Sequence, residues 1–186
     1  MKVISGKYRG RQLVALEGQN TRPTSARVKE DMFNILSNWF IYEDKVSLDL
    51  FAGSGALSIE GLSRGVKFAY INDWHKPALE VVKKNLRNIS ESEFKIFNWD
   101  FKKVLDYLGE NKKQVDLIYL DPPFPQINYY YEFFDKIAHQ NILAINGVIL
   151  TEAPEKLDLD KIKHLNLLKY KDFKNKHFYL FRLEDN

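Results

Sequence analysis

The chain has 186 residues, of which 45% are hydrophobic and 28% charged, and it contains no cysteine. This length predicts one main domain with a sizeable core, and the charged fraction argues against a disordered tail protein. The lack of cysteine excludes disulfides and thiolate zinc sites. No apolar run approaches the roughly 18 residues of a membrane helix, and the N-terminus, MKVISGKYRGRQ, has no apolar signal region. We therefore expect a cytoplasmic protein.

Positive charge is concentrated near the N-terminus. The net charge of the whole chain is +3, whereas residues 1–29 combine seven basic residues with Glu17 alone and so carry +6. A basic segment of this kind can bind nucleic acid, because each neutralised phosphate releases counterions. A solvated basic hairpin explains the charge equally well. The basic residues are Lys2, Lys7, Arg9, Arg11, Arg22, Arg27 and Lys29.

The N-terminal quarter of the chain predicts a small extension followed by a helix. Residues 2–16 read as two short strands around a turn, and residues 17–24 as a polar loop. We therefore divide the chain into an extension of a basic β-hairpin and loop (1–24) and a main domain (25–186). A helix is expected after Ser25, which can cap it. Its apolar stripe contains Val28, Met32, Ile35, Leu36, Trp39 and Phe40.

Strands and helices then alternate, which predicts a mostly parallel sheet with helices on both faces. The expected strands are 46–51, 67–72, 93–98, 115–120 and 147–152. The expected helices are 55–64, one with Pro77 in its first turn, 101–108 and 128–140. Two further strands, 164–170 and 177–183, have no helix between them, so at least one should run antiparallel.

Carboxylates follow nearly every predicted strand. Because ligands bind at the carboxyl ends of the strands in such sheets, these side chains are candidates for one site. They are Asp49, Asp73, Asp100, Asp121 and Glu152. The four histidines are scattered without metal-ligand spacing, so we predict no metal site.

The stretch DLFAGSGALS (49–58) predicts a nucleotide-binding loop with Asp49, Phe51, Gly53 and Gly55 near the cofactor. The glycines allow close approach of the backbone to a ligand, but Ser58 stands where a dinucleotide fingerprint has its third glycine or alanine. Asp49 would repel a pyrophosphate. It suits a cation or a hydroxyl, such as the amino-acid end of S-adenosylmethionine.

The next strand ends place further candidate cofactor contacts. Asp73 can accept hydrogen bonds from ribose hydroxyls, which fits both NAD and S-adenosylmethionine. Trp74 can cover an adenine face or pack between helix and sheet. Asp100 can meet the adenine amino group, cap the helix that follows, or do both.

The most discriminating stretch is LDPPF (120–124). Two prolines after a buried strand force the chain out as a rigid turn. The Asp121 carboxylate and the Pro122 carbonyl can accept hydrogen bonds from one exocyclic amine, with Pro123 stiffening the turn and Phe124 offering a stacking face. Methyl transfer needs such positioning, and Asp121 can accept the amine proton.

These motifs, with ISGKYRG, GRQL, RPTSARVKEDMFNIL and LTEAP, resemble the bacterial 16S ribosomal RNA guanine-N2 methyltransferases that modify guanine 966. The resemblance spans most of the chain. It implies a Rossmann-like class I methyltransferase fold with seven strands, the last antiparallel, S-adenosylmethionine as cofactor, and 16S rRNA in the small subunit as substrate. The RNA contacts implied are Lys7, Arg9, Arg11, Arg22, Thr24 and Arg27.

Other functions stay open at this point. An adenine-N6 methyltransferase acting on DNA or RNA needs nearly the same motif chemistry, although no separate target-recognition domain is evident. A protein glutamine methyltransferase fits Asp121 and the basic N-terminus less well. An NAD-dependent oxidoreductase is disfavoured by Ser58 and by the position of Asp49. A non-catalytic RNA-binding module is disfavoured by the intact glycine loop and DPPF. We expect a monomer.

Overall fold

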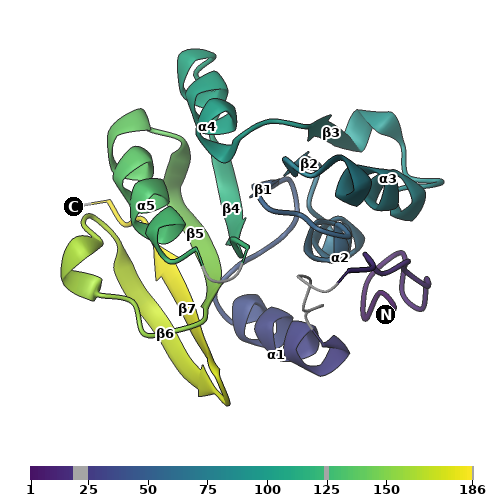
Figure 1. Cartoon of the computed structure of the whole chain (residues 1–186), viewed down its shortest axis with the longest axis horizontal. Helices are drawn as coiled ribbons and strands as arrows, with labels where there is room; N and C mark the ends of the chain where they lie inside the picture. Colours follow the sequence, from purple (N-terminus) through teal and green to yellow (C-terminus); the bar gives the residue numbers. More distant parts are fainter. Residues whose placement is uncertain (19–24, 124–125, 186) are drawn as a thin grey trace.

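The computed structural model describes residues 1–18, 25–123 and 126–185. Arg22, Thr24 and Phe124 lie outside these ranges. Within the described residues, the chain forms one seven-stranded sheet in the order β3-β2-β1-β4-β5-β7-β6 (Figure 1). Its strands are β1 (Val46–Asp49), β2 (Phe68–Asn72), β3 (Phe94–Phe97), β4 (Val115–Leu120), β5 (Leu143–Ala153), β6 (Asn166–Phe173) and β7 (Lys176–Arg182).

The strand directions confirm the predicted topology. β1 pairs in parallel with both β2 and β4, β2 with β3, and β4 with β5. β7 runs antiparallel to β5 and to β6. The chain moves outward from β1 to β3 and then returns to the other side of β1 as β4. The topological switch point therefore lies between β1 and β4, where an open sheet of this type binds its ligand.

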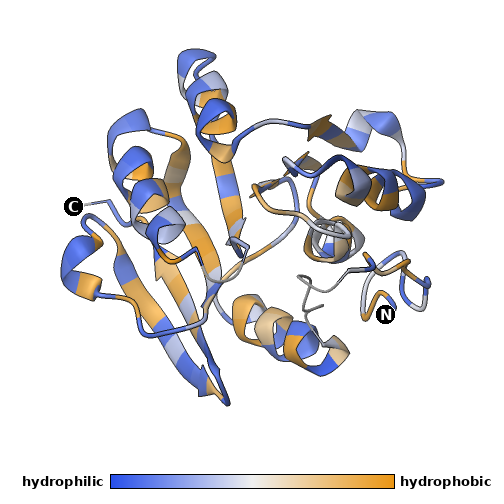
Figure 2. Cartoon of the chain, in the orientation of Figure 1, coloured by the Kyte–Doolittle hydropathy of each residue, from blue (hydrophilic) through white to orange (hydrophobic). Residues whose placement is uncertain are grey.

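Helices cover both faces of the sheet. They are α1 (Ala26–Ser37), α2 (Ala56–Arg64), α3 (Lys76–Asn85), α4 (Phe101–Glu110) and α5 (Asn128–Gln140), with 3₁₀ turns η1 (Glu91–Glu93) and η2 (Leu159–Lys161). Alternate residues of β4 face opposite sides: Tyr119 packs in the core that contains α1, and Ile118 in the core that contains α4 and α5. β4, β5 and β7 are largely hydrophobic, whereas the helices are banded (Figure 2). Among the described residues, no helix is long and apolar enough to span a membrane.

Most predicted elements are observed, with shifted ends. Ser25 caps α1 by accepting a hydrogen bond from the Val28 N–H at 3.2 Å. β1 ends at Asp49 because the chain there turns toward the glycine loop, and β5 starts earlier than expected, at Leu143. The predicted stripe of α1 extends too far, because the helix ends at Ser37, before Trp39 and Phe40. Trp39 is 41% exposed, whereas Phe40 is still buried.

The N-terminal segment (residues 1–18) differs from the two strands expected there. Its pairing is limited to one antiparallel bridge between Lys2 and Gln12, supported by backbone hydrogen bonds such as Val3 N–H to the Arg11 carbonyl at 2.9 Å. Val3 and Leu13 are buried in the same core as α2 and α3. The segment therefore packs on the main fold, beside α2 and α3 (Figure 1), and the boundary at residue 24 stays a prediction.

Candidate active site

Four carboxylates line the carboxyl edge of four adjacent strands. In sheet order they lie at the ends of β2, β1, β4 and β5, and three of them are strongly buried: Asp73 is 8% exposed, Asp49 2% and Glu152 5%. They are close enough to interact electrostatically. The charges of Asp73 and Asp121 raise the pKa of Asp49, and the charge of Glu152 raises the pKa of Asp121. The sequence predicted this row, but it also included Asp100, which is exposed and caps α4 through the Lys102 N–H at 2.9 Å.

Burial raises the pKa of three of these acids, Asp49, Asp73 and Asp121. For Asp49 burial is the main cause, the Phe51 N–H opposes it, and the charges of Asp121 and Asp73 raise the pKa further. For Asp73 burial again dominates, and the N–H groups of His75 and Gly53 oppose it. A cationic ligand would favour the ionised forms of all these groups. The edge is therefore suited to positive charge and unsuited to a pyrophosphate.

The glycine loop lies directly beside this row. Gly53 and Gly55 have φ values of 58° and 79°, a backbone region that favours glycine. The Gly53 N–H donates to Asp73 Oδ2 at 2.9 Å, so the loop after β1 is tied to the end of β2. The second Asp73 oxygen accepts from the His75 N–H at 2.9 Å. Each carboxylate oxygen has a further lone pair, so Asp73 can still accept from a hydroxyl.

Two asparagines hold this edge together, and the sequence analysis had not assigned them a role. Asn72 is buried, and its amide donates to the carbonyls of Leu50 (2.9 Å) and Trp99 (3.0 Å) while its oxygen accepts from the Trp99 N–H. Asn98 donates to the carbonyls of Asp73 and Trp74. An aspartate at residue 72 could not make these donations. The amide at residue 72 therefore fixes the relative positions of β1, β2 and the end of β3.

Aromatic side chains flank the site in two different ways. Phe51 is partly buried and stacks on Tyr129, with ring centroids 5.9 Å apart and an interplanar angle of 11°. Phe101 packs against both rings, so Phe51 belongs to a packed cluster beneath the loop. Trp74 is instead 62% exposed at the end of β2. Its ring is free of helix–sheet packing and available to a ligand.

Asp121 follows β4 and is partly buried. Burial is the main cause that raises its pKa, Glu152 raises it further, and Lys176 opposes them, which brings the pKa to about 7. Pro122 is buried and Pro123 exposed, and the Pro123 carbonyl accepts from the Gln126 N–H at 3.0 Å. Phe124 lies outside the described residues. At neutral pH, Asp121 can thus act both as a hydrogen-bond acceptor and as a proton acceptor.

Glu152 completes the row, a role that the sequence left undecided. It forms an ion pair with Lys176, the first residue of β7. The Tyr130 hydroxyl donates to the Glu152 backbone carbonyl at 2.5 Å, and Tyr130 is itself buried. Within the described part of the chain, no group of three His, Cys, Asp or Glu side chains has the arrangement of a metal site.

The predicted RNA contacts in the N-terminal segment and at the start of α1 are only partly free of other interactions. Arg9 and Arg27 are exposed, whereas Lys7 forms an ion pair with Glu93 at 2.8 Å. Arg11 donates to the backbone carbonyl of Arg87, just beyond α3. Lys29, which was counted in the basic charge of this region, is fully buried against Glu60. The surface charge of the segment is therefore smaller than its sequence suggests.

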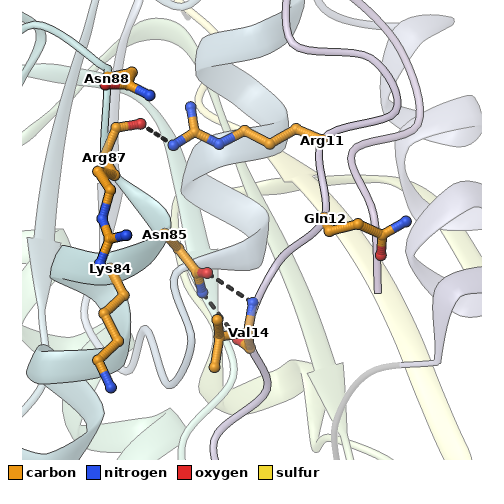
Figure 3. A pocket seen from close by; sticks show the side chains of 7 residues that line it. All are labelled: Arg11, Gln12, Val14, Lys84, Asn85, Arg87 and Asn88. Carbon is orange, nitrogen blue, oxygen red and sulfur yellow. Dashed lines mark hydrogen bonds between the residues drawn. The ribbon is translucent and has the colours of Figure 1, made fainter.

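A polar hollow of about 430 Å³ lies between the N-terminal segment and α3 (Figure 3). Its lining combines three basic side chains with no acidic one among the described residues: Arg11, Gln12, Val14, Lys84, Asn85, Arg87 and Asn88. Asn85 donates to the carbonyls of Val14 and Ser54, both at 2.9 Å. This side chain links the hollow to the glycine loop, a role that no pattern in the sequence indicates.

The sheet order, the antiparallel β7 and the loop at the switch point define the Rossmann-like fold of class I S-adenosylmethionine-dependent methyltransferases. The solved structure of yhhF from Escherichia coli matches with a TM-score of 0.84 at 26% identity, covering 100% of this chain and 99% of that chain. Precorrin-6y C5,15-methyltransferase from Geobacter metallireducens matches with a TM-score of 0.66 at 18% identity, over 91% of this chain and 94% of that chain.

The chain belongs to the family described as Conserved hypothetical protein 95, whose model matches residues 1–182. Ribosomal RNA small subunit methyltransferase D from Haemophilus influenzae is 33% identical over 187 residues, which cover 94% of this chain and 94% of that protein. The protein of the same name from Escherichia coli K12 is 32% identical over 124 residues, 67% of this chain and 60% of that protein. These relatives confirm the family resemblance drawn from the motifs.

Proposed function

We propose that this protein transfers a methyl group from S-adenosylmethionine to the exocyclic N2 amine of a guanine in 16S rRNA, guanine 966 of the small ribosomal subunit. The observation that carries the proposal is Asp121, an acceptor with a pKa of about 7, on the Pro122-Pro123 turn beside the glycine loop. The family and its rRNA-methylating relatives support the substrate class. Acting on ribosomal subunits would place the protein in the cytoplasm, and we propose a monomer.

The cofactor fits the charge of the site. S-adenosylmethionine carries an ammonium and a sulfonium, and when bound it supplies an electrophilic methyl group. Asp49, buried at the end of β1, would receive the amino-acid end, directly or through water, with Phe51, Gly53 and Gly55 forming the loop around it. Asp73 would accept from the ribose hydroxyls with its remaining lone pairs. Trp74 and Asp100, both exposed at the next strand ends, would meet the adenine.

The protein has two tasks in the reaction: it must position the guanine amine, and it must accept the proton that the amine loses. A nucleobase amine is a weak nucleophile whose lone pair is delocalised into the ring, so acceptors on its N–H groups help to orient it. Asp121 and the Pro122 carbonyl would accept those hydrogen bonds, and Phe124 would stack on the base. Asp121 would then take the proton that the amine loses on methylation. The target base must leave its helix to reach this edge, as in other enzymes that modify bases.

RNA would bind across the N-terminal segment and the start of α1. Arg9 and Arg27 are exposed there, and Lys7, Arg11, Arg22 and Thr24 are further proposed contacts. The hollow adds Lys84 and Arg87, which the sequence analysis did not select. Because Asn85 ties this surface to Ser54 in the glycine loop, RNA phosphates in the hollow would lie beside the wall of the cofactor site.

The decisive experiment is methyl transfer from labelled S-adenosylmethionine to unmodified small subunits, protein-free 16S rRNA and DNA, followed by nucleoside analysis. We expect N2-methylguanosine from small subunits, and its loss in Asp121→Ala with RNA binding retained. Label in N6-methyladenine would overturn the proposed target base while keeping the chemistry. Label that persists in Asp121→Ala would overturn the role of the DPPF turn.

A further inference from the structure

One oxygen of Glu152 has no partner although it is buried. The side chain is 5% exposed, and its Oε1 is engaged by Lys176. Its Oε2 makes no hydrogen bond within the described part of the chain. An unsatisfied buried acceptor is costly, and a charged one more so, so such a group usually serves a ligand or a water molecule. Glu152 is therefore not fully explained by its ion pair.

The free oxygen belongs to the same site as Asp121. Leu120 of β4 pairs with Thr151 of β5, so Asp121 and Glu152 are the next residues along two adjacent parallel strands. The Thr151 hydroxyl donates to the Leu120 carbonyl at 2.6 Å, which locks these strand ends together. The charge of Glu152 acts directly on Asp121. The two carboxylates thus present neighbouring acceptors at one point of the edge.

Two neighbouring acceptors match two neighbouring donors. On its Watson–Crick edge, guanine presents the N2 amine next to the N1–H, and both donate. Adenine presents its N6 amine next to N1, which accepts, so a carboxylate facing that position would repel it. The same repulsion applies to 2-aminopurine, which keeps the N2 amine of guanine but has an unprotonated N1.

We propose that Glu152 Oε2 accepts the N1–H of the target guanine while Asp121 accepts its N2 amine, which makes Glu152 the residue that selects guanine. This inference rests on the proposed function and adds its base-reading contact. Lys176 has a different role: from β7 it neutralises Oε1, whereas the base is read by Oε2. Asp121 alone cannot distinguish one exocyclic amine from another, so the selectivity requires a second group.

The test compares kcat/KM for small subunits reconstituted with ligated 16S rRNA that carries either guanine or 2-aminopurine at the target position. The enzymes are the wild type, Glu152→Gln and Lys176→Gln. A charged hydrogen bond to the substrate corresponds to roughly 10- to 100-fold in kcat/KM, so we expect the wild type to prefer guanine by about that factor. In Glu152→Gln the preference should fall toward unity, because the amide can donate to an unprotonated N1.

Lys176→Gln is the matched control, since it breaks the same ion pair and leaves the Glu152 carboxylate in place. We expect it to keep the guanine preference, and calorimetric binding of S-adenosylmethionine should be unchanged in both variants. A wild type that methylates 2-aminopurine as well as guanine would overturn the inference, and so would equal preferences in wild type and Glu152→Gln. If the wild type methylates guanine in the same assay, the proposed function holds, and either of these outcomes overturns only the role of Glu152. If the wild type instead methylates adenine, the proposed function and the inference both fail.

Discussion

Lys29 Nζ lies 3.1 Å from Glu60 Oε1, and both side chains are fully buried. The same ammonium donates to the Lys2 carbonyl at 3.0 Å, and Glu60 accepts from the Ile4 N–H at 2.9 Å. Burial is the main cause that lowers the pKa of Lys29, and Glu60 opposes it. This ion pair joins α1 to α2 and anchors the N-terminal segment to both. A lysine in the basic region is thus part of the core, not of the RNA surface.

Removing Glu60 should strongly destabilise the protein. Glu60→Ala leaves Lys29 buried without its counter-charge, which typically costs about 3–5 kcal/mol of unfolding free energy. Urea unfolding measures this loss, and hydrogen exchange should show weakened protection in residues 1–18. The control is Glu80→Ala, which breaks an exposed pair with Lys83 (3.2 Å) and should change stability by less than about 1 kcal/mol. Similar losses in the two variants would contradict the anchoring role.

The rate of methyl transfer should follow the ionisation of Asp121. Only the carboxylate accepts from the amine, and the pKa is about 7 in the free protein. We therefore expect kcat/KM to fall about tenfold per pH unit below pH 7 and to level off above it. Glu152→Gln removes one charge that raises this pKa, so its profile should shift to lower pH. A profile that is flat between pH 5.5 and 7 would argue against Asp121 as the acceptor.

The same raised pKa predicts a stability effect of opposite sign. An unfolded aspartate has a pKa near 3.9, so between about pH 4 and 7 the folded state holds a proton that the unfolded state has lost. Stability contributed by this group is present below pH 4 and is lost as pH rises through 7. Asp121→Asn should therefore stabilise the protein at pH 8, by roughly 1–4 kcal/mol, and much less at pH 4. Urea unfolding at the two pH values, compared with the wild type, tests the difference, and equal effects at both would refute it.

Asn72→Asp should disrupt the carboxyl edge of the sheet beside the glycine loop, although the edge already carries several carboxylates. The change removes donations to the Leu50 and Trp99 carbonyls and leaves both facing a carboxylate. We expect a loss of about 2–4 kcal/mol in stability and weaker S-adenosylmethionine binding by calorimetry. Asn98→Asp is the matched control, since residue 98 is exposed and water can replace its lost donations. Equal losses in both variants would show that burial of the Asn72 amide is not decisive.

The hollow predicts a change in the salt dependence of RNA binding. Neutralising Arg11, Lys84 and Arg87 with glutamine should lower the slope of log K against log salt by roughly 2–3, because each phosphate contact contributes about 0.7–0.9. Filter binding to small subunits or 16S rRNA between about 50 and 200 mM salt measures the slope. The control variant neutralises Lys102, Lys103 and Lys136 on α4 and α5, with the same change in charge. A slope reduced equally in both would indicate a general charge effect.

Local patterns in the sequence predicted most strands and helices and the acidic side chains at the carboxyl edge of the sheet. The spacing of apolar residues located the strands and helices, since a strand or helix with one buried face repeats apolar residues at a regular interval along the sequence. Ser25 indicated the start of a helix. The acids at the ends of the predicted strands indicated the site, because the carboxyl ends of parallel strands lie along one edge of a sheet. The ends of β1 and β5 and the exposure of Trp39 were missed, because they depend on where the chain turns away from its neighbours.

Which polar residues pair with one another depends on how the elements pack in three dimensions. Lys29 pairs with Glu60, Asn85 joins Val14 to Ser54, and Glu152 lies beside Asp121, in each case across tens of residues. Periodicity records which side of an element is buried, but not which distant group a buried polar atom meets. A lone lysine or asparagine looks the same in sequence whether it is solvated or paired. The cost of burying it unpaired is what makes its partner specific, and that partner becomes visible only when the strands are side by side.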